Sequence, residues 1–278
     1  MAEALTYAAL QSRALIAISG PDWRAFLQGL ITQDVETMAP GEARFGALLT
    51  PQGRLLYDLF VVGLEDGAWL DVEARHRDAV IQRLMMYRLR AKVELLPSDV
   101  PVSILFPGAD NEPGEGWVRD PRLPELGWRG YGVSAPAGAV MADEAAREAQ
   151  KLRLGVAGPN DWGSDKTYPI EANFDLLNGI DFRKGCFVGQ ETTSRMKRRG
   201  QIKSRMLPIR FEGPPPAPGS EILAGDLRAG EVLSGADGEA MALVRLDRAL
   251  GGNLTVDGRS VVLDQPAWFL EALGELTP

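Results

Sequence analysis

The chain has 278 residues, of which 45% are hydrophobic and 24% charged, and its formal net charge at pH 7 is −8. Ordinary globular composition at this length predicts about two domains and disfavours disorder, fibrous repeats and wholesale nucleic-acid binding. One cysteine excludes an intramolecular disulfide, and with a single histidine it also excludes a structural zinc site or a cluster held by four thiolates of this chain.

Compartment and membrane contact are judged from the same composition. No stretch approaches the ~18 consecutive apolar residues that a membrane span needs. The N-terminal residues do not combine a basic start with a long apolar run. We therefore expect a cytoplasmic protein with no membrane partner.

The first half of the chain predicts strands and helices without regular alternation. Apolar alternation predicts a strand at 14–18, and Pro21 then opens a helix whose apolar face includes Trp23 and Leu27. Turn signals and periodicity predict the next elements: strands near 43–50, 54–64 and 68–73, a helix at about 76–88, and strands around 92–96 and 101–106. This mixture indicates the α+β class.

The second half contains the clearest boundary. Residues 107–130 are rich in Gly, Pro and Trp and predict a loop, a candidate point of division between two lobes, before a helix near 143–154. The run GPPPAPG at 213–219 is a linker signal. The short β-like pieces beyond it, with a helical turn at 245–250, predict a small antiparallel barrel. We expect one region at 1–204, the two lobes, and a barrel domain at 205–278.

The segment that carries chemistry is KGCFVGQE at 184–191, which holds the single cysteine. Gly189 is expected to open a helix that runs through Met196. The amides at the start of that helix, with the cations Arg183 and Lys184, would favour the thiolate form of Cys186. Cys186 is therefore the candidate reactive thiol, with Lys184 beside it, and the alternative is that Cys186 is a small buried hydrophobe.

The octapeptide KGCFVGQE closely resembles the signature of the YgfZ family, the folate-binding relatives of the glycine-cleavage T-protein, an aminomethyltransferase. Further stretches resemble the family in the same order, so that the likeness covers nearly the whole chain: FLQGLITQDV at 26–35, LLTPQGRLLYDLFV at 48–61 and YPIEAN at 168–173. The resemblance implies a T-protein-like fold of two intertwined α+β lobes closed by a C-terminal antiparallel β-barrel, around a channel that holds tetrahydrofolate or another folate.

The resemblance also implies a function. The family assists the assembly or repair of iron–sulfur proteins, including the iron–sulfur enzymes that modify transfer RNA by thiolation. Iron–sulfur client enzymes are therefore the expected protein partners. The chain is expected to hold no metal of its own, with Cys186 as a transient iron ligand.

Glu171 lies where the T-protein pattern places a carboxylate that binds the pterin ring of folate. A carboxylate can accept the paired donors of a pterin, in charge-assisted hydrogen bonds worth roughly 1.5–3 kcal/mol. Gly185 and Gly189, with the neighbouring Gln190, are candidates for cofactor binding because glycines let a backbone approach a ligand closely. The alternative for Glu171 is a solvated or capping side chain.

Residues 183–205 form a basic segment with eight Lys or Arg and one acidic residue. Arg195 and Arg199 are candidates for a clamp on the anionic glutamyl tail of the folate. The segment has two other readings: a docking patch for RNA or an acidic protein, and an exposed face on which Arg195 pairs with Glu191. RNA is the weakly supported partner, because no aromatic residue follows Phe187 within the segment.

Two alternatives to an accessory factor are open at this point. An active tetrahydrofolate-dependent aminomethyltransferase needs a catalytic aspartate just after the strand at 69–74, where the best alignment puts Val80, with Asp78 out of register. The transferase pattern also carries an acid at the position of Cys186. The second alternative is an RNA or protein adaptor whose folate site is vestigial.

Overall fold

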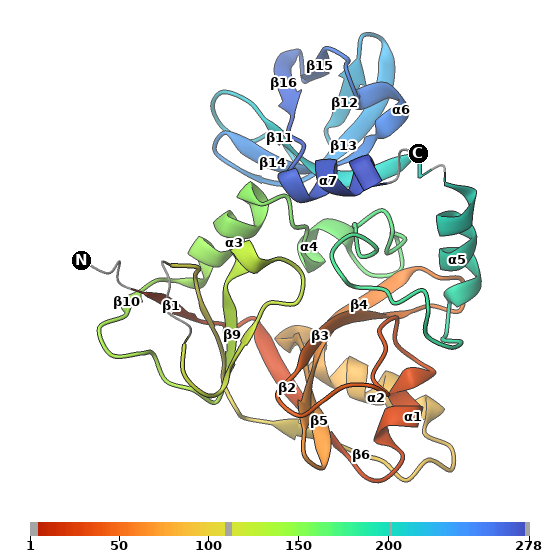
Figure 1. The fold of residues 1–278 in the computed structure, drawn as a ribbon. Helices are drawn as coiled ribbons and strands as arrows, with labels where there is room; N and C mark the ends of the chain where they lie inside the picture. Colours follow the sequence, from red (N-terminus) through yellow and green to blue (C-terminus); the bar gives the residue numbers. More distant parts are fainter. Residues whose placement is uncertain (1–4, 109–112, 201, 276–278) are drawn as a thin grey trace. The chain divides into compact units, whose positions relative to one another are not determined.

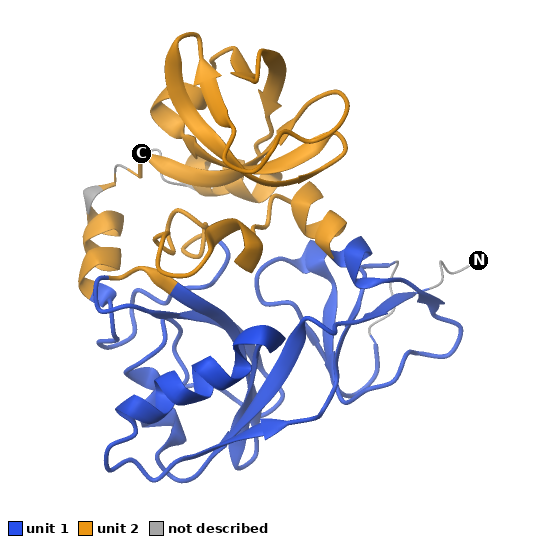
Figure 2. Cartoon of the chain, turned by 180° about the vertical axis from the view of Figure 1, so that it is seen from behind, with its two compact units in different colours: residues 1–52, 56–147, 177–190 blue, residues 53–55, 148–176, 191–278 orange. Residues whose placement is uncertain are grey.

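A computed structural model describes residues 5–108, 113–200 and 202–275, without the side chains of Arg199 and Glu275. The chain forms two compact units, which Figure 2 colours separately. Unit 1 comprises residues 1–52, 56–147 and 177–190, and unit 2 comprises residues 53–55, 148–176 and 191–278.

Unit 1 contains two five-stranded sheets (Figure 1). The first has the order β3-β4-β5-β2-β6, with β2 at Arg13–Ser19, β3 at Ala43–Leu49, β4 at Leu55–Leu64, β5 at Gly67–Glu73 and β6 at Glu94–Ser98. The second has the order β10-β1-β7-β9-β8, with β1 at Thr6–Ala9, β7 at Val102–Leu105, β8 at Trp117–Arg119, β9 at Trp128–Tyr131 and β10 at Val140–Met141.

The first sheet forms one wall of a core that helices α1 (Trp23–Gln28) and α2 (Arg77–Tyr87) complete. Strands β2 and β5 pair antiparallel, so Ile16 lies opposite Leu70, and both are fully buried. Alternate residues of a strand share a face, which is why the apolar positions of β2 reach the core together. This core fixes the end of α1, on which the candidate site is built.

The elements expected between residues 14 and 106 are confirmed, with ends shifted by a few residues. The expectation of a loop at 107–130 is wrong, because β8 and β9 lie there and pair with each other, and β9 also pairs with β7. The strand β9 is hard to recognise from the sequence because it contains Gly130, and glycine is uncommon inside strands. A Cβ there would come within 2.6 Å of the Trp117 ring and 2.5 Å of Val133, so close packing requires the glycine.

Unit 2 contains a closed antiparallel barrel with the strand order β11-β14-β13-β12-β15-β16 (Figure 1). Its strands are β11 (Ser204–Arg210), β12 (Glu221–Ala224), β13 (Leu227–Ala236), β14 (Glu239–Arg245), β15 (Leu254–Val256) and β16 (Arg259–Leu263). Inward-facing apolar side chains such as Ile209, Ile222 and Val244 fill the barrel. The predicted C-terminal barrel is thus confirmed.

The remaining helices are α3 (Glu144–Arg153), α4 (Pro159–Trp162), α5 (Gln190–Arg199), α6 (Leu246–Ala249) and α7 (Ala267–Glu275). The sequence predicted α3, α5 and α6 but not α4 or α7. Helix α7 closes onto the barrel core through the buried ring of Phe269, and the indole of Trp268 donates to the carbonyl of Leu154 at 2.8 Å. Residues 148–176 therefore belong with the barrel in unit 2, and the boundary between 204 and 205 stays a prediction.

Across the described ranges, no helix combines the length and the apolar composition needed to cross a membrane.

Candidate functional site

The single cysteine lies in a loop that is fastened to the segment after α1. We call residues 181–189 the thiol loop. At its start, the amide of Asp181 donates to the carbonyl of Thr32 at 3.0 Å. Near its end, the amide of Val188 donates to the carbonyl of Gly29 at 3.1 Å. Both ends of the loop are therefore tied to a backbone that the unit 1 core holds in place.

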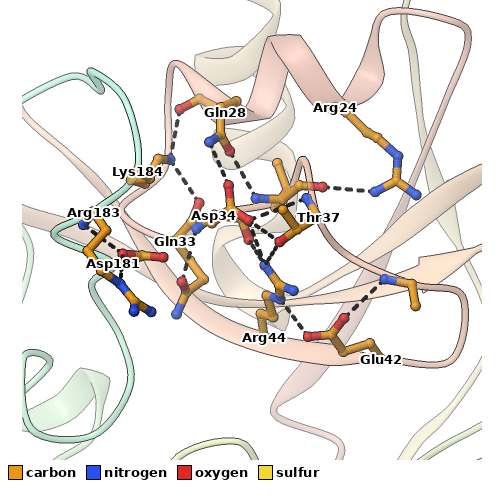
Figure 3. A network of polar contacts seen from close by, with 12 residues as sticks. Arg24, Gln28, Gln33, Asp34, Thr37, Glu42, Arg44, Asp181, Arg183 and Lys184 are labelled. Carbon is orange, nitrogen blue, oxygen red and sulfur yellow. Dashed lines mark hydrogen bonds and ion pairs between the residues drawn. The ribbon is translucent and has the colours of Figure 1, made fainter.

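The side chain of Lys184 is the central fastening of the thiol loop (Figure 3). Its Nζ donates to the carbonyls of Gln28 at 2.8 Å, Ile31 at 2.7 Å and Gln33 at 2.8 Å. An ammonium has three donors, so this geometry uses all of them. The residue is 9% exposed, and burial lowers the pKa of Lys184 to about 8.

These contacts give Lys184 a role that the sequence did not suggest. It was expected to act on the Cys186 sulfur through its charge, whereas its ammonium is directed at backbone carbonyls (Figure 3). The side chain of Arg183 is 95% exposed. An electrostatic action of either cation on Cys186 stays a prediction, while the anchoring by Lys184 is a contact of the structure.

The turn that receives Lys184 is itself braced by Asp34 (Figure 3). The carboxylate accepts from Gln28 Nε2 at 2.7 Å, from Arg44 at 2.8 Å and from the Thr37 hydroxyl. Burial opposes the charge of Asp34, but these hydrogen bonds outweigh it and lower the pKa of Asp34 to about 2. Sequence reasoning missed this residue, although the family-like run at 26–35 contains both Gln28 and Asp34.

Cys186 itself is exposed, which rules out the alternative of a small buried hydrophobe. A Cβ added at Gly185 would meet no atom within 4 Å, so the backbone beside the thiol faces open space. Gly189 has φ +83°, a left-handed conformation that glycine adopts readily, and the chain then enters α5 at the half-buried Gln190. The expected helix after Gly189 is therefore confirmed.

A cavity of about 310 Å³ adjoins the thiol loop in unit 1. Its lining combines acidic, basic and amide side chains: Gln33, Asp34, Thr37, Arg44, Asn178, Asp181 and Arg183, with Ala43, Phe45 and Pro121. Arg44 is already paired with Asp34 and Glu42, whereas Arg183 lies at 3.8 Å from Asp181 and is open to solvent. A molecule in this cavity would touch the thiol loop through Asp181 and Arg183.

Glu171, the expected pterin ligand, belongs to unit 2. Its Oε2 accepts from the backbone amide of Tyr168 at 2.9 Å, which is the capping contact considered as the alternative. Its other oxygen, Oε1, accepts no hydrogen bond from the described residues. Burial raises the pKa of Glu171, partly offset by the Tyr168 amide and the charge of Arg54. A half-buried carboxylate with one oxygen to spare fits a ligand rich in N–H donors.

The basic segment 183–205 is not one uniform charged face. Arg205 is buried and pairs with both oxygens of Asp175, at 2.5 and 2.9 Å. Arg195 is half exposed and lies 3.9 Å from Glu191, which is the pairing expected from their spacing. The side chain of Arg199 lies outside the described residues.

The structure thus gathers Lys184, Gly185, Cys186 and Gly189 in one loop of unit 1, while Glu171 and Arg195 belong to unit 2. Within the part of the chain that the structure describes, no three His, Cys, Asp or Glu side chains gather into a metal site.

Comparison with known proteins first defines the class of fold. The chain is similar to aminomethyltransferase T of the glycine cleavage system from Bartonella henselae, with a TM-score of 0.76 over 94% of this chain and 85% of that chain. The two are 19% identical, so the likeness shows the fold alone. Residues 203–271 also match the family model of the CAF17 C-terminal β-barrel domain. The predicted T-protein-like α+β fold is confirmed.

Relatives in sequence then give the family. The chain is 30% identical over 279 residues to the mouse iron–sulfur cluster assembly factor IBA57, covering 87% of this chain and 78% of that protein. The human protein is 29% identical with the same coverage, and the Neurospora crassa homolog is 32% identical over 74% of this chain. This chain belongs to the IBA57 family, and it spans 54% of the Neurospora crassa relative.

The expectation of a cytoplasmic protein is contradicted by these relatives, because the human, mouse and Neurospora crassa proteins are all designated mitochondrial. The physical reason for the error is that a lone cysteine and the lack of a spanning segment do not distinguish one interior compartment from another.

Proposed function

We propose that this chain assists the assembly of iron–sulfur proteins by presenting Cys186 as a transient ligand to iron. The observation that carries the proposal is an exposed thiol on a loop whose two ends and central lysine are fixed to the unit 1 core. Membership of a family whose named members are iron–sulfur cluster assembly factors supports it. The family-like octapeptide around the thiol supports it further.

The chemistry of the proposed step is ligand exchange. The Cys186 thiol releases its proton to solvent, and the thiolate donates an electron pair to an iron atom of the cluster, which is the cargo. No oxidation state changes. Clusters are held by about four thiolates, and this chain offers one, so the other ligands come from the client or donor protein.

Tetrahydrofolate, or another folate, is the proposed cofactor. Glu171 would hold the pterin by accepting its N–H donors on Oε1, because Oε2 is engaged with the Tyr168 amide. Gly185, Gly189 and Gln190 stay candidates for close backbone approach, and Arg195 with Arg199 for the glutamyl tail. A bound tetrahydrofolate would supply a carrier for one-carbon units.

The test replaces the thiol in cells that depend on this chain. We expect Cys186→Ala and Cys186→Ser to fold normally but to lower the activity of a [4Fe–4S] enzyme. Thiolated nucleosides in transfer RNA, measured in the same cells, test whether tRNA-modifying enzymes are among the clients. Ser260→Ala, at an exposed position of the barrel strand β16, is the matched control. Full client activity in the Cys186→Ala cells would refute the proposed ligand.

A further inference from the structure

The C-terminal end of α2 exposes three apolar side chains that the proposed function does not use. Met85, Met86 and Leu89 are 40%, 63% and 90% exposed. Met85 and Met86 lie in the last turn of α2, and Leu89 follows the helix cap at Arg88, whereas Val80 and Leu84 face the core. Single exposed apolar residues are ordinary, but three neighbours form a patch. We call Met85, Met86 and Leu89 the apolar tip.

The backbone holds Leu89 in a conformation that disfavours a leucine. Its φ is +42°, in the left-handed region, immediately after the helix cap at Arg88. Glycine usually occupies this position, because any residue with a Cβ pays a steric cost there. Neither local backbone preference nor burial therefore explains the leucine. Strain of this kind at an exposed position points to a function outside folding.

Basic residues flank the apolar tip in the sequence. Residues 79–93 contain no acidic residue and four basic ones, namely Arg83, Arg88, Arg90 and Lys92. The last three are exposed, and Arg83 stacks over the Tyr87 ring at 5.5 Å. In the described part of the chain none of the four side-chain cations forms an ion pair, while the backbone amide of Lys92 donates to the Asp22 carboxylate at 2.7 Å. The nearest acids in sequence, Asp78 and Glu94, stand at the two ends of the run.

We infer that this surface binds an anionic phospholipid bilayer, with the apolar tip inserted below the headgroups and the exposed cations on the lipid phosphates. A stable protein interface usually takes about 20–30 residues on each side, far more than this patch offers. A bilayer needs no complementary pocket and accepts a protruding side chain, and charge adds to the attraction. Such surface contact requires no spanning helix, but it departs from the expectation of no membrane partner.

Co-sedimentation of the full chain with phosphatidylcholine vesicles, with and without phosphatidylglycerol, tests the inference. We expect binding only when phosphatidylglycerol is present, and weaker binding as salt screens the cations. Leu89→Glu should lower the partition coefficient by about tenfold or more, because the leucine proposed to insert into the lipid is replaced by a charge that the anionic headgroups repel. The matched control is Leu227→Glu, the same change at a leucine on β13 that is 60% exposed, and it should bind like the parent.

A second variant separates binding from folding. Leu89→Gly removes the apolar side chain and, because glycine adopts the left-handed conformation without steric cost, it also removes the strain. This variant should unfold at no lower temperature than the parent and yet bind the vesicles less. The inference is overturned if the parent ignores phosphatidylglycerol. It is equally overturned if Leu89→Glu and Leu89→Gly both bind as the parent does, since binding would then belong to another basic surface such as residues 183–205.

Discussion

A lysine ammonium has three donors, and Lys184 places all of them on carbonyls at and just beyond the end of α1. Carbonyls at a helix C-terminus lack partners within the helix and attract positive charge. A change at Lys184 therefore acts first on the thiol loop, and it reaches Cys186 through the backbone.

Lys184→Met should loosen the thiol loop without unfolding unit 1. Three carbonyls lose their donor, so we expect a stability loss of about 1–3 kcal/mol. The amide of Val188, bonded to Gly29 in the parent, should lose protection against hydrogen exchange. Lys184→Arg keeps the charge but not the compact three-donor geometry, so its stability and its Val188 protection should lie between those of the parent and Lys184→Met. Parent-like protection of Val188 in Lys184→Met would contradict the anchoring role.

The same variant has a pH signature. The pKa of Lys184 is about 8 in the folded chain and near the ordinary value of 10.5 once unfolded, so the folded state binds fewer protons between these values. The stability of the parent relative to Lys184→Met should therefore rise as pH goes from about 8 to 10.5, and it should stay level below pH 7. Chemical denaturation at several pH values measures this difference.

Glu171→Gln separates the ligand role of this residue from its capping role. The amide oxygen can still accept from the Tyr168 amide, so the turn should survive. Because burial raises the pKa of Glu171, the carboxyl favours folding most below its ordinary pKa of 4.5, and this advantage is lost as pH rises. At neutral pH the variant should be at least as stable as the parent.

Tetrahydrofolate titration by calorimetry completes that test. Loss of one charge-assisted hydrogen bond, worth roughly 1.5–3 kcal/mol, should weaken binding by about tenfold or more. An unchanged affinity in Glu171→Gln would remove this carboxylate from the proposed folate site.

The sequence pointed to the residue at the centre of the site, whose reactivity stays a prediction, but it could not predict the contacts around that residue. The octapeptide pointed to Cys186, and glycine beside it pointed to an exposed backbone. Lys184, however, binds carbonyls about 150 positions earlier in the chain. No local pattern encodes such a pairing, because it depends on which turn the core brings beside the loop.

At the scale of elements, periodicity located the strands and helices that carry regular apolar faces, including β2, β4 and α2. It failed where side chains are small or elements short. Gly130 concealed β9, and α7 was overlooked because its place in the barrel core depends on the distant strands that surround Phe269. Tertiary packing, which a local window does not contain, decided both cases.

The two glycines near the thiol, Gly185 directly before Cys186 and Gly189 three residues after it, give a prediction about stability. Gly189→Ala puts a Cβ on a left-handed residue and should cost roughly 1–2 kcal/mol of stability. Gly185→Ala meets open space and should leave the melting temperature unchanged. Thermal unfolding of the two variants side by side checks this, and equal melting temperatures would show that Gly189 is not held in this conformation.

At the scale of the whole molecule, residues 205–278 are predicted to be a domain, yet unit 2 joins them to residues 148–176. The Asp161 carboxylate accepts from the Ser234 hydroxyl, and the Leu154 carbonyl accepts from Trp268. We expect a fragment of 205–278 to keep the barrel but to melt below the full chain. A fragment as stable as the full chain would show that these bonds contribute nothing.

Cys186 sets a limit on covalent assembly. Since each chain has one thiol and that thiol is exposed, an added oxidant that takes two electrons and two protons from two copies leaves a single Sγ–Sγ bond between them. Both thiols are then used, so a third copy has nothing to attach to. Oxidation therefore yields covalent dimers and nothing larger, and a reductant converts each dimer back into two separate chains.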